Sequence, residues 1–359
     1  MKKLYGRTTT APHFYLHLRG DMKLTQSMST LIPSITRTAL RTYTKFMCGY
    51  VLFVIFAGAL VTSHDAGLSV PDWPTTYGEN MFLFPVYKWV GGIFYEHGHR
   101  LVAFGIGTLT LILAPWTWFV EDRRWVRNLT FAALGIVICQ GLLGGLTVIL
   151  KLPVLVSSAH AVLAQTFLGI VLILAYAHST EYRATRNETV TTDSKLLGGA
   201  VLSLILIYLQ LIIGAVMRHS QAGLAVLDFP TMGGSFIPSI SESTIRHINE
   251  ARQVIGFGEV TSHQVFLHLL HRGGAIAVSV VVIAFVWKAC TLPGVSPRVK
   301  SLAQIFGGAL FLQFALGVVT ILSVRNPFIA SFHVLTGALF LALAVLLTLR
   351  VRPQSTLRS

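Results

Sequence analysis

The hydrophobic and polar positions of the 359-residue chain alternate in long blocks of Leu, Ile, Val, Ala and Gly separated by short polar segments. A transmembrane α-helix needs about 20 apolar residues. Stretches near that length fall at residues 44–63, 97–120, 127–150, 155–177, 196–217, 262–289, 301–324 and 330–350. They are continuous rather than alternating residue by residue, which argues against a transmembrane β-barrel. The pattern predicts an all-α membrane protein with eight transmembrane helices.

Composition and charge agree with this prediction. Hydrophobic residues make up 53% of the chain and charged residues only 12%, which is too apolar for one water-soluble core. Most of the 28 Lys and Arg residues lie in segment 1–45, near residues 122, 187 and 295, and at the C-terminal end of the chain. Because Lys and Arg stay on the cytoplasmic side, we expect both termini to be cytoplasmic. The net charge of +14 needs no nucleic-acid partner to explain it.

Segment 1–45 is rich in Lys, Arg, Ser and Thr and contains one acidic residue, Asp21. That composition resembles an organelle transit peptide. The interpretation we favour is a plain basic cytoplasmic tail.

The sequence contains an internal repeat. GALVTSHDAGLSVPDWPTTYG at 58–78 matches GAVMRHSQAGLAVLDFPTMGG at 214–234 without a gap. Further downstream, Gln140, Gly144, Thr147 and His160 match Gln313, Gly317, Thr320 and His333. We therefore expect two tandem, pseudo-symmetric four-helix bundles at 46–178 and 196–350, a cytoplasmic linker at 179–195 and a tail at 351–359. The repeated Gln and Thr are expected to hydrogen-bond between helices, and the repeated Asp72 and Asp228 to cap turns.

Each predicted bundle carries one histidine on its second helix and one on its fourth: His99 and His160, then His271 and His333. These helices face each other across a bundle, so each pair suits a haem iron, with Arg100 and Arg272 as candidate propionate contacts. A single histidine here would more simply be an interfacial residue bonded to water or to a carbonyl. Recurrence in both bundles favours iron ligands, whereas zinc would need further ligands nearby.

Glu96 breaks the symmetry of the repeat. It precedes His99 by three residues, on the same helix face, and His268 takes its place in the second bundle. A carboxylate beside a haem can act as a general base or stabilise positive charge. An ion pair with Arg100, or a solvated acid at the helix start, explains its position equally well. His97 is turned away from this face, so we expect it to be a bystander.

Several motifs together resemble the haem A synthase family from the first predicted helix to the last. They are GLSVPDWP, EHGHR, SSAHAVLAQTFLG, HLLHR and SFHVLTGALF. The resemblance implies an enzyme that oxidises the C8 methyl group of haem O to the formyl group of haem A, with water as the oxygen source, for terminal oxidase assembly. It implies that Glu96 is catalytic, that His99 and His160 bind the substrate haem, and that His271 and His333 bind a haem B cofactor.

The resemblance also implies haem O as substrate, a lipid bilayer as surroundings, haem O synthase as a candidate partner, and an electron acceptor that the sequence does not name. It leaves open whether the chain forms a homo-oligomer. The first outer loop, 64–96, is compact and lacks the cysteine pair that some members carry. This excludes a thiol relay there and favours the bacterial cytoplasmic membrane over the mitochondrial inner membrane. The alternative function is a di-haem b-type cytochrome that exchanges electrons with quinone, which leaves the single Glu96 unexplained.

Overall fold

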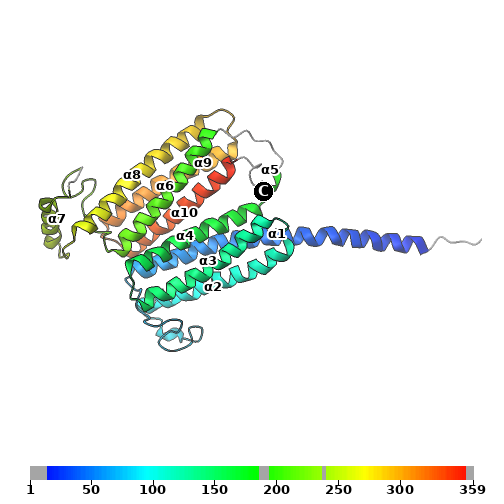
Figure 1. The fold of residues 1–359 in the computed structure, drawn as a ribbon, viewed down its shortest axis with the longest axis horizontal. Coiled ribbons are helices and arrows are strands. Elements are labelled where there is room, and N and C mark those ends of the chain that lie inside the picture. The colour runs from blue at the N-terminus through cyan, green and yellow to red at the C-terminus, as the bar shows by residue number, and fades with distance from the viewer. Residues whose placement is uncertain (1–13, 186–193, 237–239, 353–359) are drawn as a thin grey trace, which may run out of the picture.

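The computed structural model describes residues 14–185, 194–236 and 240–352, and all its regular elements in these ranges are helices (Figure 1). Eight of them are long and apolar enough to cross a membrane, which confirms the predicted all-α membrane protein with eight spans. The spanning helices are α1 (Phe14–Ser63), α2 (Gly92–Val120), α3 (Arg124–Ile149), α4 (Val154–Ala177), α6 (Ser194–His219), α8 (Ser262–Thr291), α9 (Pro297–Leu322) and α10 (Pro327–Val351). The shorter ones are η1 (Val86–Lys88), α5 (Thr180–Thr185) and α7 (Glu242–Val254).

By their contacts the spanning helices form two groups of four, and the two groups can be followed in Figure 1. In the first group α1 and α3 each pack on both α2 and α4, so α2 and α4 lie at opposite corners. In the second group α6 and α9 each pack on both α8 and α10, so α8 and α10 lie at opposite corners. The two groups meet through α1, α4, α6 and α10. The helices that carry the predicted iron ligands are therefore diagonal partners in both groups.

The two ends of the helices carry different elements. The start of α1, the end of α10 and α5 lie at one end, and α7 and the loop that contains η1 lie at the other (Figure 1). Two helix starts differ most from the prediction. Helix α1 is already helical from Phe14, within the segment expected to be a tail, and α2 begins at Gly92 rather than at residue 97. The polar Glu96 and His97 suggested a helix mouth, but both are buried within α2.

Helix α7 lies in the second outer loop, between α6 and α8, and was not predicted. It begins after Ser241, whose hydroxyl accepts a hydrogen bond from the Thr244 amide at 3.2 Å. Its buried Ile248 belongs to a small apolar cluster with Ala225, Val226, Val260 and Val265. The helix is short and polar, so it contains no apolar block that would mark it as a membrane span.

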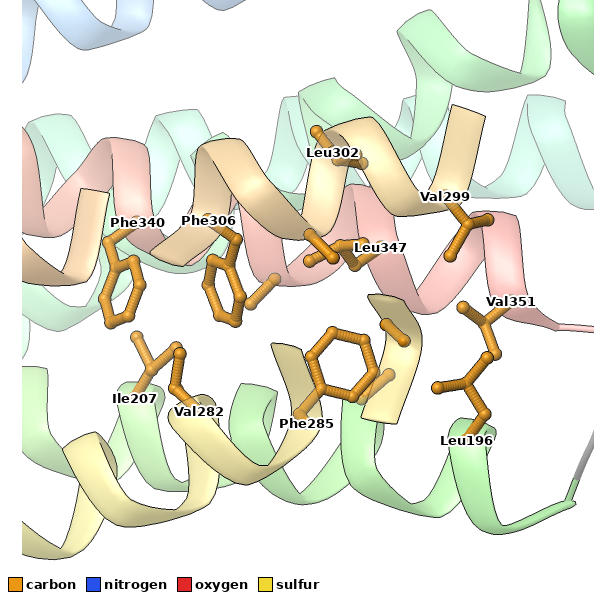
Figure 2. Packing of buried hydrophobic residues seen from close by; sticks show 14 of the residues in the cluster. Leu196, Ile207, Val282, Phe285, Val299, Leu302, Phe306, Phe340, Leu347 and Val351 are labelled. Atoms are coloured by element: carbon orange, nitrogen blue, oxygen red, sulfur yellow. The ribbon is translucent and has the colours of Figure 1, made fainter. Parts of the chain in front are cut away.

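Apolar side chains fill the end of each bundle nearer α5. In the second bundle Phe306 stacks on Phe340 with ring centroids 4.6 Å apart, and it meets Phe285 edge-on at 6.3 Å (Figure 2). Contacts of this kind hold helices together inside a bilayer, where water is absent. On α8 this cluster begins at Val278, about two helical turns beyond His271. The polar candidate residues therefore lie between the apolar cluster and the outer loops.

Candidate functional site

The four predicted iron ligands each pack against a glycine on a neighbouring helix. An added Cβ atom would lie 2.9 Å from Cε1 of the histidine for Gly58 and His99, 3.2 Å for Gly144 and His160, 3.0 Å for Gly214 and His271, and 3.1 Å for Gly317 and His333. At these distances any side chain on the glycine would displace the ring or its neighbour. Small residues at helix contacts allow this close approach, so the glycines set where the imidazoles lie.

Within each bundle the two histidines lie on diagonally opposed helices, His99 on α2 with His160 on α4, and His271 on α8 with His333 on α10. All four rings are only half-buried, although they face neighbouring helices. Nδ1 of His99, His160 and His333 is buried without a hydrogen-bond partner, and such atoms call for an explanation. Among the described residues, no three His, Cys, Asp or Glu side chains gather into a metal site. Paired imidazoles with free nitrogens and no further ligand fit a haem iron, whose ring supplies the remaining ligands.

A glutamine amide contacts three of the four rings. Nε2 of Gln210 lies 3.0 Å from Nδ1 of His271, and the same group lies 3.4 Å from Nε2 of His160 for Gln140 and 3.5 Å from Nε2 of His333 for Gln313. Gln210 and Gln140 also donate to the backbone carbonyl of their histidine, at 2.7 Å and 2.9 Å. Each glutamine lies four residues before the glycine on the same helix, and Val54 takes that position before Gly58. His99 therefore has no such partner.

The predicted interhelical hydrogen bonds are confirmed for Gln140 and Gln313 and are wrong for the threonines. The Thr147 hydroxyl bonds to the Gly144 carbonyl at 2.6 Å, and Thr320 bonds to Leu316 at 2.7 Å, both within one helix. A threonine hydroxyl reaches the carbonyl of the preceding turn more easily than a neighbouring helix. Gln210 was not singled out in the sequence, because its place in the first half of the repeat holds Val54.

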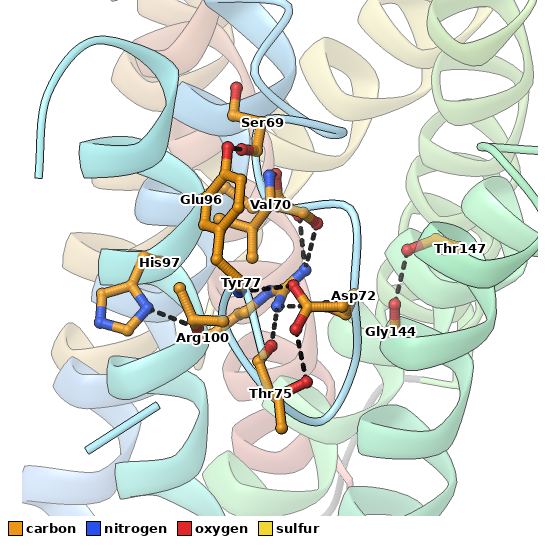
Figure 3. Close-up of polar contacts among 11 residues, drawn as sticks. Ser69, Val70, Asp72, Thr75, Tyr77, Glu96, His97, Arg100, Gly144 and Thr147 are labelled. Carbon is orange, nitrogen blue, oxygen red and sulfur yellow. Dashed lines mark hydrogen bonds and ion pairs between the residues drawn. The ribbon is translucent and has the colours of Figure 1, made fainter. Parts of the chain in front are cut away.

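Glu96 joins α2 to the first outer loop (Figure 3). Its carboxylate accepts hydrogen bonds from the Arg100 guanidinium and the Val70 amide, both at 2.8 Å. The Glu96 and Arg100 side chains are only 5% and 11% exposed. Arg100 also donates to the carbonyl oxygens of Val70, Asp72 and Thr75 at 2.9, 2.7 and 3.1 Å. The ion pair considered as an alternative is therefore present, while catalysis by Glu96 and propionate binding by Arg100 stay predictions.

The second bundle connects α8 to its outer loop in the same way, with neutral His268 in place of the carboxylate. We call this connection between helix and outer loop the loop joint. Arg272 donates from Nε to Nε2 of His268 at 3.0 Å, and the Val226 amide lies 3.3 Å from Nδ1 of that ring. Arg272 also donates to the carbonyl oxygens of Thr231 and Val226, at 3.1 Å each. Because an imidazole that accepts from a guanidinium is uncharged, Arg272 has no ion pair at the position where Arg100 has Glu96. Its predicted propionate contact stays a prediction.

Asp72 and Asp228 cap equivalent outer turns, as predicted. Asp72 accepts from the Tyr77 and Gly78 amides at 2.8 Å each and from the Thr75 hydroxyl, and Asp228 accepts from the Gly233 and Gly234 amides at 2.9 and 3.0 Å. Burial opposes ionisation at both carboxyls, but these hydrogen bonds outweigh it and lower the pKa of Asp72 and of Asp228. The turn brings Trp73 onto α3, where a Cβ atom at Gly145 would lie 2.5 Å from the indole. This indole therefore lies next to Gly144, the glycine that contacts His160.

His97 points away from His99 and holds the outer loop. Its ring is fully buried, bonds to the Thr76 hydroxyl at 3.0 Å, and lies 4.6 Å from Trp89 and 5.1 Å from Phe84 between ring centroids. The sequence placed it outside the haem slot but did not reveal this packing role.

Arg218 connects the two bundles and was not singled out in the sequence. It donates to the Ala59 carbonyl and the Ser63 hydroxyl at 2.8 Å each, and Ser331 donates to Ser63 at 2.9 Å. The sequence feature that could have identified Arg218 is its position: it is a cation at the end of an apolar helix, and the matching residue in the first half of the repeat is Thr62. It lies one turn beyond Gly214 and so adds positive charge beside the second histidine pair.

The fold and the site together define a multi-pass membrane protein with two helical bundles, each presenting a pair of histidines on diagonally opposed helices. The chain belongs to the COX15-CtaA family, described as cytochrome oxidase assembly protein, whose model matches residues 41–345. This membership and the relatives below confirm the family suggested by the sequence motifs.

Several relatives cover most of the chain. The heme A synthase of Shewanella oneidensis is 25% identical over 289 residues, which span 75% of this chain and 83% of the relative. The heme A synthase of Halalkalibacterium halodurans is 28% identical over 297 residues, 79% of this chain and 88% of the relative. That of Rickettsia bellii is 25% identical over 331 residues, 83% and 94% of the two chains.

Proposed function

We propose that this protein acts as a haem A synthase, a membrane enzyme that oxidises the C8 methyl group of haem O to the formyl group of haem A, with water as the oxygen source. The observation that carries the proposal is one arrangement of histidine, glycine and arginine in both bundles, with a carboxylate, Glu96, in only one. Family membership and the heme A synthases among its relatives support it. The product would serve the assembly of a terminal oxidase.

The two bundles are proposed to hold different haems. His99 and His160 would bind the substrate haem O in the bundle at 46–178, and His271 and His333 would bind haem B in the bundle at 196–350. Haem B, when bound, supplies an iron with a reversible one-electron couple. The free ring nitrogens and the glycine contacts support the assignment.

The two bundles are proposed to be a tandem, pseudo-symmetric repeat. Left-handed backbone conformations occur at matching places, at Asp65 and Gln221 after the first helix of each half. They recur at Lys151 with Leu152 and at Val324 with Arg325, before the last helix of each half. Helix packing at the junction is matched as well, since α1 and α6 each contact the last helix of the other half.

Glu96 is the proposed catalytic residue. Oxidation of a methyl group with water releases protons together with electrons, and a carboxylate can take up a proton or stabilise positive charge at the reacting carbon. The Arg100 and Val70 contacts, at 2.8 Å each, fix where this carboxylate lies. The electrons would leave through the second bundle to an acceptor that is not identified. Arg100 and Arg272 are the proposed propionate contacts.

The membrane topology is proposed from the charges. The excess of Lys and Arg at the end of the helices with α5 favours cytoplasmic termini. The compact first outer loop favours the bacterial cytoplasmic membrane, with the mitochondrial inner membrane as the alternative. Haem O synthase, which would deliver the substrate, is the candidate partner.

Co-expression with a haem O synthase in a host that makes no haem A tests the proposal. Haems extracted from the membranes are separated and identified by mass and absorption. A formyl haem that appears only with this chain is the expected result. A di-haem b-type cytochrome would bind haem and leave only haems B and O in the extract, and that result would overturn the enzyme assignment.

A further inference from the structure

We propose that His99 is the exchangeable axial ligand of the substrate haem, because Val54 stands where a glutamine braces each of the other three histidines. The inference rests on the haem sites of the proposed function and adds to them the residues that decide which ligand is released. It makes Gln140, Gln210 and Gln313 positioning residues.

The bracing follows from one helical spacing. Gln140, Gln210 and Gln313 each stand four residues before the glycine that contacts a histidine, at Gly144, Gly214 and Gly317. Residues four apart lie on one helix face, so the glycine admits the ring while the glutamine meets it one turn away. On α1 the pair is Val54 and Gly58, with the ring of His99 at the glycine. Val54 packs into the apolar core of the first bundle.

The three glutamines contact their histidines through the amide nitrogen. Nε2 of Gln140 and of Gln210 donates to the backbone carbonyl of the histidine and also lies against its ring, at 3.4 and 3.0 Å. Nε2 of Gln313 lies 3.5 Å from the ring of His333. Each glutamine therefore restricts how far its imidazole can move.

This contact decides how firmly a histidine is held at the iron. A side chain that fixes the orientation of a metal-ligating ring typically contributes about 10–100-fold to metal affinity. Val54 has no polar group and offers His99 no such contact. His99 is therefore the most easily released of the four.

The asymmetry matches what each bundle has to do. The second bundle braces both of its histidines, His271 and His333, and would keep its haem through many turnovers. In the first bundle only His160 contacts a glutamine. A haem bound there would therefore stay attached through His160 while His99 dissociates from the iron. A substrate that must enter and a product that must leave need such a site.

The test uses the purified full-length protein loaded with haem B as the probe. Carbon monoxide binds reduced haem iron only where an axial position opens, so its binding per haem reports ligand release. The variants are Val54→Gln, which supplies the missing amide, and Val54→Leu, which changes the same side chain without adding one. Haem loss to apomyoglobin gives the dissociation rate.

We expect the wild type to bind carbon monoxide at one of its two haems. Val54→Gln should reduce that binding and slow haem loss from this site by about 10–100-fold, and Val54→Leu should leave both unchanged. Gln140→Val should accelerate haem loss from the first site, and Gln210→Val should open the second site to carbon monoxide. If Val54→Gln does not fold, the results for Gln140→Val and Gln210→Val test the inference instead.

Two failures are distinguishable. Haem bound with the same carbon monoxide binding in the wild type, Val54→Gln, Gln140→Val and Gln210→Val would overturn this inference and leave the proposed function standing. A wild type that binds no haem would overturn the proposed function, and the inference with it.

Discussion

The two helical bundles have the same arrangement of helices and differ in the residues that lie beside the histidines. Both place an imidazole against a glycine on each of two diagonal helices, and both tie the outer loop to a helix through an arginine. At the arginine the first bundle has Glu96 and the second His268, and at the first histidine the first has Val54 and the second Gln210. We propose that the shared residues hold a haem in place, and that the differing ones set the local charge and how easily a histidine is released from the iron.

The charge difference is the larger of the two. Arg100 is paired with Glu96, whereas Arg272 is paired with a neutral imidazole and has Arg218 on the neighbouring helix. A charge-assisted hydrogen bond from arginine to a carboxylate is stronger than a neutral one. In the proposed haem B site, Arg272 would meet a propionate without a carboxylate hydrogen-bonded to it, whereas Arg100 already has Glu96 as its counter-charge.

Removing an iron ligand from the second bundle should have the largest effect. His271→Ala or His333→Ala removes half of the axial ligation that we assign to haem B, so we expect that haem to be lost and haem A formation to stop. Haem content per chain and extracted haem A measure both. Either variant with its full haem content and normal haem A would refute the second-bundle assignment.

Exchanging the residue beside Arg272 sharpens the charge comparison. His268→Glu should preserve the loop joint, because Glu96 forms the same joint in the first bundle, but it neutralises Arg272. Since a hydrogen bond to a charged group contributes about 1.5–3 kcal/mol and only part is lost, haem B should dissociate on the order of tenfold faster. The rate is measured by transfer to apomyoglobin. His268→Gln, which keeps the position uncharged, is the matched control, and equal rates in both variants would contradict the charge argument.

The smallest effect is expected at the outer turns. The pKa of Asp72 is lowered from 3.8 by the Gly78 and Tyr77 amides and the Thr75 hydroxyl, against the opposing effect of burial. Its stabilisation is therefore fully present above pH 3.8 and is lost as the pH falls through the lower folded-state pKa. The melting temperature of the wild type should fall more on acidification below that pH than that of Asp72→Asn. Parallel curves for the two proteins would show that the turn adds nothing.

Hydrophobic block length was enough to predict the eight spans, and the repeat together with four-helix-bundle geometry predicted the diagonal placement of the histidine helices. It was not enough where polar residues are buried by other parts of the chain. Glu96 and His97 shifted the expected start of α2, because only the folded loop reveals that they are covered. Helix α7 was missed because it is held by a cap at Ser241, by the buried Ile248 and by Arg252, which donates to carbonyls of the loop.

The repeat showed some site residues and concealed others. His99, His160, His271 and His333 were found because they recur, and Glu96 because its counterpart differs. Gln210 was missed because its counterpart is Val54, and its role depends on a contact with His271 that sequence spacing alone does not reveal. The ring positions depend on glycines of adjacent helices, which no single-helix pattern identifies.

The central claim is that the carboxylate of Glu96 makes the first bundle the one that oxidises haem O. Glu96→His tests it most directly, because His268 shows that a histidine at this position still joins the arginine to the outer loop. The variant is co-expressed with haem O synthase in a host without haem A, and bound and extracted haems are measured. We expect no haem A, with haem B retained in the second bundle. Haem A at the wild-type level would contradict it.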